Sequence, residues 1–153
     1  MNKFKNINAV LIGNPNTGKS TVFNKLTGLN QSVGNYPGVT VDKKVGYFKL
    51  NKEQKVTLTD LPGTYSLNPN SLDENVVLDY LLESSEESKI DVVLFITEIE
   101  HIKRTLLLLT QLKDLKLPVV VVINMADRME KKGVTLDMPL LEKLLQAKVV
   151  LVS

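Results

Sequence analysis

The sequence predicts an α/β fold: a doubly wound, mostly parallel sheet with helices on both faces and one antiparallel strand. Segments typical of buried strands alternate with segments typical of helices, which favours right-handed βαβ units. The run Val119–Ile123 contains only β-branched residues, as is typical of a parallel strand covered on both faces. With 153 residues, 43% of them hydrophobic, the chain suits one compact domain with a core.

The first part of the chain predicts a strand, a helix and a hairpin. The apolar run Ile7–Ile12 is typical of a buried strand, and Lys19–Leu26 favours a helix that stops at Gly28. Val45–Leu50 and Lys55–Thr59 alternate around a short polar turn, and this pattern predicts an antiparallel pair.

The second part predicts three helices and three strands. Ser71 and Glu74 have the spacing of a capping box, which predicts a helix that runs to Leu82. The later elements are expected to be a strand over Asp91–Ile96, a helix over Ile102–Leu115, a strand over Val119–Ile123, a helix over Pro139–Gln146 and a strand over Val149–Val152. The leucines of the Ile102–Leu115 helix are expected in the core, with one side formed by Leu106, Leu109, Leu112 and Leu115.

Composition excludes several classes of function. The 19 Lys and Arg nearly balance the 17 Asp and Glu, which argues against a nucleic-acid partner. There is no cysteine for disulfides or thiolate metal sites, and His101 is the single histidine. No apolar run approaches the roughly 18 residues that span a bilayer, and Met1–Asn6 is no signal peptide, so a soluble, cytoplasmic domain is expected. His101 and the acidic segment Glu83–Glu87 are expected to be solvated surface groups.

The sharpest motif is GNPNTGKS, a complete G-x-x-x-x-G-K-[ST] loop between the first predicted strand and helix. Its glycines let backbone N–H groups and the helix N-terminus face phosphate oxygens. Lys19 is expected to reach the β- and γ-phosphates, and the Ser20 hydroxyl to bind Mg²⁺. The alternative, a glycine turn before a solvated lysine, explains the complete motif less well. The predicted nucleotide contacts in this region are Gly13, Asn14, Pro15, Asn16, Thr17, Gly18, Lys19, Ser20 and Thr21.

A second group of candidate contacts directly follows the strand that ends at Thr59. It consists of Asp60, Leu61, Pro62 and Gly63. Asp60 can hold a water on Mg²⁺, and Gly63 can offer its N–H to the γ-phosphate. Alone, D-x-x-G could be a plain Asp-Pro-Gly turn, but its place after a phosphate-binding loop favours nucleotide chemistry.

A third group follows the strand Val119–Ile123 and predicts guanine recognition. It consists of Asn124, Met125, Ala126 and Asp127. The Asp127 carboxylate can accept hydrogen bonds from guanine N1–H and the exocyclic amine, a donor pair that adenine lacks. The motif is common by chance, and Asn124 could instead cap a helix with Asp127 in its first turn. Its position after a strand favours GTP and GDP as ligands.

The segment Gly34–Thr40, with two glycines and a proline, predicts a mobile loop. Thr40 is the natural candidate for a second Mg²⁺ ligand that orders the loop only when γ-phosphate is present. Gly38 and Val39 are expected to approach the nucleotide with it. The alternative is a polar surface loop without a role in binding.

Together, GNPNTGKS, GNYPGVTV, DLPGTYSL and NMAD resemble the N-terminal G domain of the bacterial ferrous iron transport protein B (FeoB) family, within the TrmE-Era-EngA type of P-loop GTPases. The resemblance runs from Ile7 to Ser153. It implies a Ras-like fold with the second strand antiparallel, slow GTP hydrolysis, and regulation of ferrous iron uptake across the bacterial inner membrane. The domain would then act on the cytoplasmic side, with a membrane-embedded iron-transport domain of the same polypeptide as its partner.

The resemblance also implies activation by K⁺, with Asn16 at the position of the family's K⁺-coordinating asparagine. Thr64 stands where Ras-like enzymes keep a water-orienting glutamine, so a cation near the β- and γ-phosphates could replace the charge of an arginine finger. The alternative is that Asn16 only braces the turn. The expected catalytic residues are therefore Lys19, Asn16, Thr40 and Gly63.

The sequence departs from the family's pattern in two places. Glu98–Leu106 reads EIEHIKRTL, where the family usually has D-A-x-N-L-x-R-N-L. The chain also ends at Ser153, where the family's second guanine loop should begin, and Ser153 itself is an expected guanine contact. Residues 1–153 are thus expected to be a G domain truncated at its C-terminal end, with the final sheet face partly uncovered.

Two other functions remain open at this point. A ribosome-assembly or tRNA-modification GTPase shares the potassium-type asparagine, and sequence beyond Ser153 would distinguish it. A non-hydrolysing GTP switch module is the other, because Thr64 replaces glutamine. A single-turnover hydrolysis assay with K⁺ would decide this second question.

Overall fold

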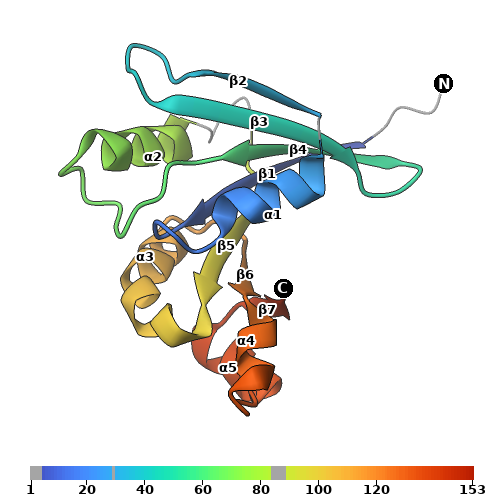
Figure 1. Ribbon diagram of the computed structural model, residues 1–153. Coiled ribbons are helices and arrows are strands. Elements are labelled where there is room, and N and C mark those ends of the chain that lie inside the picture. The colour runs from blue at the N-terminus through green and yellow to red at the C-terminus, as the bar shows by residue number, and fades with distance from the viewer. Residues whose placement is uncertain (1–4, 29, 84–88) are drawn as a thin grey trace.

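The computed structural model describes residues 5–28, 30–83 and 89–153 (Figure 1). The strands are β1 (Lys5–Gly13), β2 (Gln31–Asn35), β3 (Asp42–Lys49), β4 (Gln54–Asp60), β5 (Val92–Glu98), β6 (Val119–Asn124) and β7 (Lys148–Leu151). The helices are α1 (Lys19–Thr27), α2 (Leu72–Glu83), α3 (Ile102–Asp114), α4 (Ala126–Lys131) and α5 (Met138–Leu145), with the short 3₁₀ helix η1 at Ile99–His101.

The strands form one seven-stranded sheet in the order β2-β3-β4-β1-β5-β6-β7. The β1, β4, β5, β6 and β7 strands pair in parallel, whereas β3 is antiparallel to both β4 and β2. The predicted doubly wound, mostly parallel sheet is therefore confirmed, as is the hairpin that places an antiparallel strand beside β4.

The edge strand β2 was not expected from the sequence. All of Gln31–Asn35 is exposed, so the segment lacks the apolar alternation by which a half-buried strand is recognised. Backbone pairing holds it instead, with Gly34 opposite Lys43 and Asn35 opposite Asp42. The prediction of a loop over Gly34–Thr40 was thus wrong for Gly34 and Asn35.

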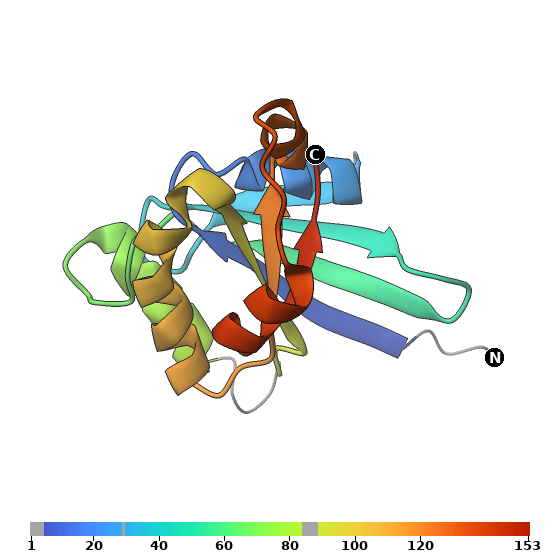
Figure 2. The ribbon, with the colours of Figure 1, turned by 90° about the horizontal axis from the view of Figure 1, so that it is seen from below.

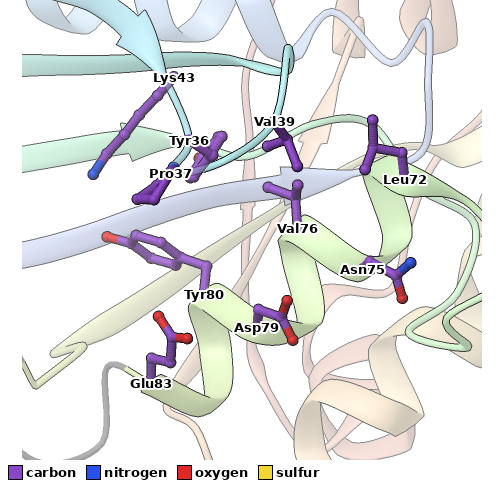
Figure 3. A pocket seen from close by; sticks show the side chains of 10 residues that line it. All are labelled: Tyr36, Pro37, Val39, Lys43, Leu72, Asn75, Val76, Asp79, Tyr80 and Glu83. Carbon is purple, nitrogen blue, oxygen red and sulfur yellow. The ribbon is translucent and has the colours of Figure 1, made fainter.

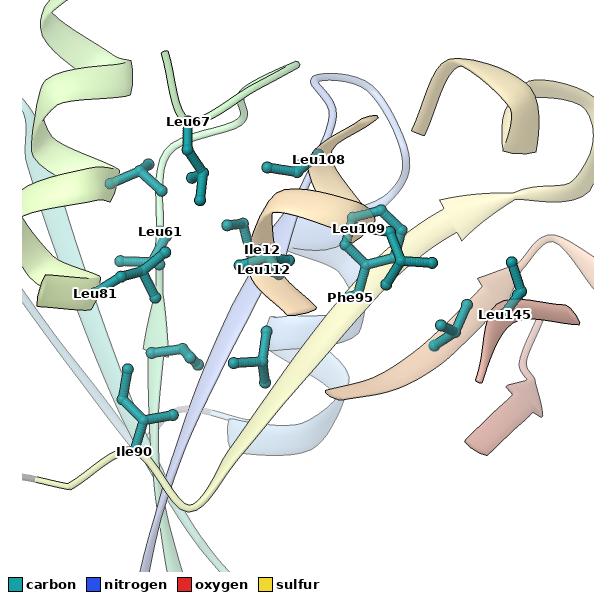
Figure 4. Packing of buried hydrophobic residues seen from close by; sticks show 14 of the residues in the cluster. Ile12, Leu61, Leu67, Leu81, Ile90, Phe95, Leu108, Leu109, Leu112 and Leu145 are labelled. Carbon is teal, nitrogen blue, oxygen red and sulfur yellow. The ribbon is translucent and has the colours of Figure 1, made fainter. Parts of the chain in front are cut away.

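Helices cover both faces of the sheet (Figure 2). Successive side chains of β1 point to opposite faces, so this strand packs against helices on each side. Val10 and Ile12 join the larger core, which α2, α3 and α5 cover, and this packing is seen in Figure 4. Ala9 and Leu11 face the other way and pack with Phe23 of α1. The carboxyl end of β1 is therefore fixed from both sides.

The face that α3 buries differs from the prediction. Its buried residues are Thr105, Leu108, Leu109 and Leu112. Leu106 and Leu107 are 41% and 54% exposed, so the expectation that the leucines of this helix are core was wrong for these two. The buried residues follow the i, i+3, i+4, i+7 spacing of one helical face, on which Leu106 does not lie.

The start of α2 forms half of the predicted capping box. The Glu74 N–H donates to Ser71 Oγ over 3.2 Å. The Glu74 carboxylate accepts from the Asn70 N–H at 3.1 Å and the Ser66 hydroxyl at 3.3 Å. This glutamate therefore ties the helix to the loop that follows Gly63.

The predicted surface groups lie only partly within the described ranges. His101 and Glu83 are exposed, as expected, whereas residues 84–87 lie outside the described residues. Val150 and Leu151 of β7 are also exposed, at the end of the sheet where partial cover was expected. Within the described ranges, no helix has the length and apolar character needed to cross a bilayer.

Candidate nucleotide site

The loop between β1 and α1 has the backbone geometry that a phosphate-binding loop needs. Asn16 and Gly18 both have positive φ, at 64° and 79°, so the chain curls before α1 begins at Lys19. At Gly18 a Cβ would lie 2.2 Å from Nδ2 of Asn124, so a side chain is excluded by space as well as by backbone conformation. The Thr17 hydroxyl donates to the Asn14 carbonyl over 3.0 Å and holds the curl closed.

This loop forms one wall of a cleft of about 460 Å³. The residues around the cleft are Asn14, Pro15, Asn16, Gly18, Lys19, Ser20, Gly63 and Asp73. The cleft thus brings Gly63 of the second motif beside residues of the first. It also includes Asp73, which was not predicted, since the Ser71–Glu74 pattern was interpreted only as a helix start.

Lys19, which lines the cleft, contacts Asp60, 41 positions later in the sequence. The Lys19 ammonium forms an ion pair with Oδ1 of Asp60, and the two side chains are only 11% and 9% exposed. The residue predicted to hold phosphate therefore lies beside the residue predicted to act on Mg²⁺. The pairing arises because β4 is parallel to β1, so that both strands end on the same side of the sheet.

The segment after Asp60 packs directly on the phosphate-binding loop. A Cβ at Gly63 would lie 3.1 Å from the backbone of Pro15, and the Thr64 N–H donates to the Gly13 carbonyl at 3.0 Å. The Thr64 hydroxyl donates to the Ser66 carbonyl over 2.7 Å, and the residue is 3% exposed. Thr64 is therefore turned into the protein and does not orient a water in the cleft.

The guanine motif lies against the same loop. The Asn124 side-chain amide donates to the Thr17 carbonyl over 3.1 Å, and Met125 takes a left-handed conformation with φ at 60°. Asp127 falls in the first turn of α4, with its side chain 52% exposed and a long 3.8 Å contact to Lys131. Its carboxylate is thus accessible to a ligand, while Asn124 serves the loop rather than capping the helix.

Ser153 lies close to the guanine motif. The Ala126 N–H donates to the Val152 carbonyl at 3.0 Å, and the Val152 N–H donates to the Ile123 carbonyl at 2.9 Å. Lys25 of α1 donates to the Ser153 carbonyl over 2.9 Å. The structure therefore brings Ser153 to the same end of the sheet as Asp127.

Thr40 is not among the residues that line the cleft. The loop between β2 and β3 is closed at its base by a 3.0 Å bond from the Tyr36 N–H to the Val41 carbonyl. Gly38 has φ at 75°, and Thr40 is exposed. Val39 lines a different pocket, so the expected contacts of Gly38, Val39 and Thr40 with nucleotide are not assembled in this conformation.

Tyr36 anchors this loop to β4. Its ring is 6% exposed, and its hydroxyl donates to the main-chain carbonyl of Asp60 at 3.4 Å. Burial, and to a lesser degree the neighbouring Tyr80 and Asp60, raises the pKa of the Tyr36 hydroxyl well above its ordinary value. The loop that carries Thr40 is thereby connected to a predicted Mg²⁺ residue.

The residues of the cleft fit a phosphate group with a bound cation. A lysine, a curled backbone and the N-terminus of α1 converge there, and all three favour an anion. The Ser20 hydroxyl and the Asp60 carboxylate supply the oxygen ligands that Mg²⁺ prefers. Asn14 also lines the cleft, and its buried Oδ1 has no hydrogen-bond partner within the described residues.

A strand, a curled phosphate loop and a helix, with an aspartate at the end of the adjacent parallel strand, define a P-loop GTPase domain of Ras-like fold. The sequence profile of the family described as ferrous iron transport protein B matches residues 7–153. The chain therefore belongs to that family, and it corresponds to the family's N-terminal G domain.

Individual relatives agree with this assignment. The chain is 47% identical over 139 residues to the Fe(2+) transport protein A/Fe(2+) transporter FeoB fusion protein of Porphyromonas gingivalis, covering 91% of this chain and 16% of that protein. The structure of the cytosolic domain of L. pneumophila FeoB is similar with a TM-score of 0.82 and 46% identity, over 94% of this chain and 55% of that one. The cytosolic domain of the T. maritima FeoB iron transporter in a GDP form gives a TM-score of 0.86 and 37% identity, over 97% and 57%. The chain spans 16% to 21% of the length of the curated relatives it matches.

Proposed function

We propose that this domain binds and hydrolyses GTP and that its nucleotide state regulates ferrous iron uptake. The observation that carries the proposal is the ion pair between Asp60 and Lys19, a lysine of the phosphate loop that lines the cleft. A lysine there can exchange its carboxylate partner for phosphate oxygens, and the aspartate is then available to a hydrated cation. The GDP form of a relative with 37% identity supports the choice of nucleotide.

The residues predicted to bind nucleotide have separate tasks in this proposal. Lys19 and the backbone N–H groups of residues 13–20 would hold the β- and γ-phosphates, and the Gly63 N–H would meet the γ-phosphate. Ser20 and, through water, Asp60 would hold Mg²⁺, with Thr40 joining when its loop closes. The bound ion would supply positive charge between the β- and γ-phosphates. Asp127 would accept from the guanine base, with Met125, Ala126 and Ser153 around it.

Potassium is the proposed second cation. The Thr64 hydroxyl is bonded to Ser66 and buried, so Thr64 does not replace the water-orienting glutamine. Asn16 lines the cleft and has a left-handed backbone conformation within the phosphate loop. A neutral amide oxygen is a suitable ligand for a weakly held monovalent cation, which supports Asn16 as the K⁺ ligand.

The role proposed for this domain in the cell follows from its relatives, whose polypeptides are longer than this chain. The curated relatives are Fe(2+) transporters of which this chain matches about a fifth. We propose that the domain acts at the cytoplasmic side of the bacterial inner membrane, with a membrane-embedded iron-transport domain of the same polypeptide as partner. The near balance of charges supports a partner other than nucleic acid.

The proposal is tested by comparing wild type with Lys19→Ala in a fluorescent GDP titration and in single-turnover GTP hydrolysis. We expect loss of tight binding in Lys19→Ala, because that ammonium is the point charge on the phosphates. Lys52→Ala, on an exposed turn far from the cleft, is the matched control and should behave as wild type. Equal affinity of all three proteins would refute the assignment of the cleft.

One observation favours a second candidate, a GTP switch that does not hydrolyse its ligand. The buried Thr64 hydroxyl cannot activate water from its present position. Single-turnover assays in KCl distinguish the two candidates, since a switch without hydrolysis would bind GTP and leave it intact.

A further inference from the structure

A second pocket, of about 400 Å³, lies between the Tyr36–Val39 segment and α2 (Figure 3). None of its lining residues lines the nucleotide cleft. Its volume is within the range of small-molecule sites, although at the lower end. One wall is the loop that carries Thr40, and the other is the helix that follows the Asp60–Gly63 motif.

The floor of the pocket is apolar. Leu72, Val76 and Tyr80 are four residues apart on α2 and form one ridge of the helix. Val39 and Val76 point toward each other across the space (Figure 3). Leu72 is 48% exposed, so part of this apolar surface is not covered by the rest of the described chain.

Lys43, the one cationic side chain among the described residues that line the pocket, contacts two aromatic rings. The rings of Tyr36 and Tyr80 meet edge to face, with centroids 6.1 Å apart and planes at 82°. The Lys43 ammonium lies 5.6 Å from the Tyr36 ring and 5.8 Å from the Tyr80 ring, within the range of a cation–π contact. Its charge is therefore directed to the two aromatic faces.

The carboxylates of the pocket have no such partner. Asp79 and Glu83 lie one turn apart on α2, and neither forms an ion pair with a described residue. Two carboxylates against one ammonium give the lining a net negative charge, although the chain as a whole has a net charge of +2. The pocket therefore offers an apolar floor with an acidic rim, and its complement is a cation with an apolar body.

We propose that this pocket is a second ligand site, which takes a compact apolar group carrying an amine or guanidinium head. The apolar body packs between Val39, Leu72 and Val76, and the cationic head lies toward Asp79 and Glu83. Such a group occurs in free organic amines and in a peptide that carries a basic residue next to an apolar one.

A ligand there contacts two segments that are each bonded to the end of β4. The Tyr36 hydroxyl bonds to the Asp60 carbonyl at 3.4 Å, and the Tyr80 hydroxyl contacts Oγ1 of Thr59 at 3.2 Å. Both walls are thus attached to the end of β4, where the Mg²⁺ aspartate lies. The ligand and the nucleotide should change each other's affinity by the same factor, and this link rests on the proposed GTP-binding function.

The site itself is tested by NMR titration of the ¹⁵N,¹³C-labelled protein with phenethylamine hydrochloride. Shifts should be confined to residues around Val39, Val76 and Tyr80, with a dissociation constant in the millimolar range expected of a probe with about nine non-hydrogen atoms. The anion 3-phenylpropionate has a similar size and should bind more weakly. Equal binding of the anion, or shifts scattered over the surface, would overturn the proposal.

Two pocket variants test separately how the carboxylates and the cavity contribute to binding. Asp79→Asn with Glu83→Gln should weaken phenethylamine by about two- to fivefold, the range of an exposed ion pair. Leu72→Trp should fill the cavity and abolish the localised shifts. Asp114→Asn, an exposed carboxylate of α3, is the matched control and should change nothing. Undiminished binding in both pocket variants would place the probe elsewhere and end the proposal.

Two final experiments identify the kind of molecule that the pocket binds and measure the coupling between this ligand and the nucleotide. Tighter localised binding of the dipeptide N-acetyl-Leu-Arg-amide than of phenethylamine would assign the site to a polypeptide, and the reverse order to a free amine. Repeating the titration with saturating GDP measures the link to nucleotide. Because the first titrations contain no nucleotide, failure of the proposed GTPase function would leave them unaffected.

Discussion

The side-chain amide of Asn124 donates a hydrogen bond over 3.1 Å to the main-chain carbonyl of Thr17, 107 positions earlier in the sequence. Asn124 is 7% exposed, and its Nδ2 occupies the space next to Gly18 where a Cβ would otherwise lie. The residue that opens the guanine motif therefore holds the phosphate loop. A substitution in one motif should consequently change the conformation or the ligand affinity of the other.

Asn124→Ala should destabilise the domain by about 1–2 kcal/mol, since the Thr17 carbonyl loses its partner in a buried position. GDP affinity should fall as well, although Asn124 need not touch phosphate. Urea unfolding and a fluorescent GDP titration measure the two effects. Asn24→Ala, on the exposed side of α1, is the control. Equal GDP affinity in both variants would show that Asn124 does not couple the guanine motif to the phosphate loop.

Asp127→Asn should weaken GTP and relax discrimination against other purines by about 1–3 kcal/mol, because a polar group at the base is left unpaired. The check is competition between GTP, ATP and xanthosine triphosphate for the same site. Met125 stands where many GTPases have lysine, so modest nucleotide affinity and fast GDP release are also expected. An unchanged preference for GTP over ATP would mean that guanine is recognised elsewhere.

Thr40→Ala should leave GDP affinity near that of wild type and slow GTP hydrolysis. Thr40 is exposed and lies outside the cleft, so it can contribute only after its loop has moved. Parallel GDP titrations and single-turnover assays at saturating Mg²⁺ give the comparison. If GDP affinity falls as much as hydrolysis, Thr40 has a role in the nucleotide-binding step itself.

Hydrolysis should be faster in KCl than in NaCl at equal ionic strength, and Asn16→Ala should remove this difference while sparing GDP binding. Thr64 is bonded to Ser66, and the sequence has no arginine in residues 13–20 or 34–40, so neither segment supplies an arginine for the charge that develops between the β- and γ-phosphates. Asn24→Ala should retain the potassium effect. Identical wild-type rates in the two salts would instead favour activation by a protein partner.

Alkaline pH should unfold wild type more readily than Tyr36→Phe. The folded-state pKa of Tyr36 is raised above the unfolded value of about 10, so the native protein keeps a proton that the unfolded chain loses. The contribution of Tyr36 to the free energy of unfolding is fully present below about pH 10. Above that pH it falls by at most about 1.4 kcal/mol per pH unit. Urea unfolding between pH 8 and about 11, with tyrosinate absorbance, checks this. Parallel pH curves for the two proteins would contradict it.

The sequence was informative wherever burial or a complete motif imposes a pattern. The apolar runs of β1 and β6 and the loop between β1 and α1 lie where they were predicted, and half of the capping box at Ser71 forms. β2 was missed because its side chains are exposed on both faces, and only backbone pairing identifies it. Asp73 was missed for a different reason, since its approach to the cleft depends on how the loop after Gly63 places α2.

The loop that carries Thr40 is the connection of a hairpin. Asn35 and Asp42 face each other where β2 and β3 end, and the Tyr36 N–H closes the base of the loop against Val41. Ordering the tip on a ligand would thus immobilise little more than residues 37–40, at about 1–2 kcal/mol per residue. The conformational entropy of the flanking backbone is already lost when the sheet forms. The free energy required to order this loop is therefore set by the length of the tip and not by the whole segment between α1 and β4.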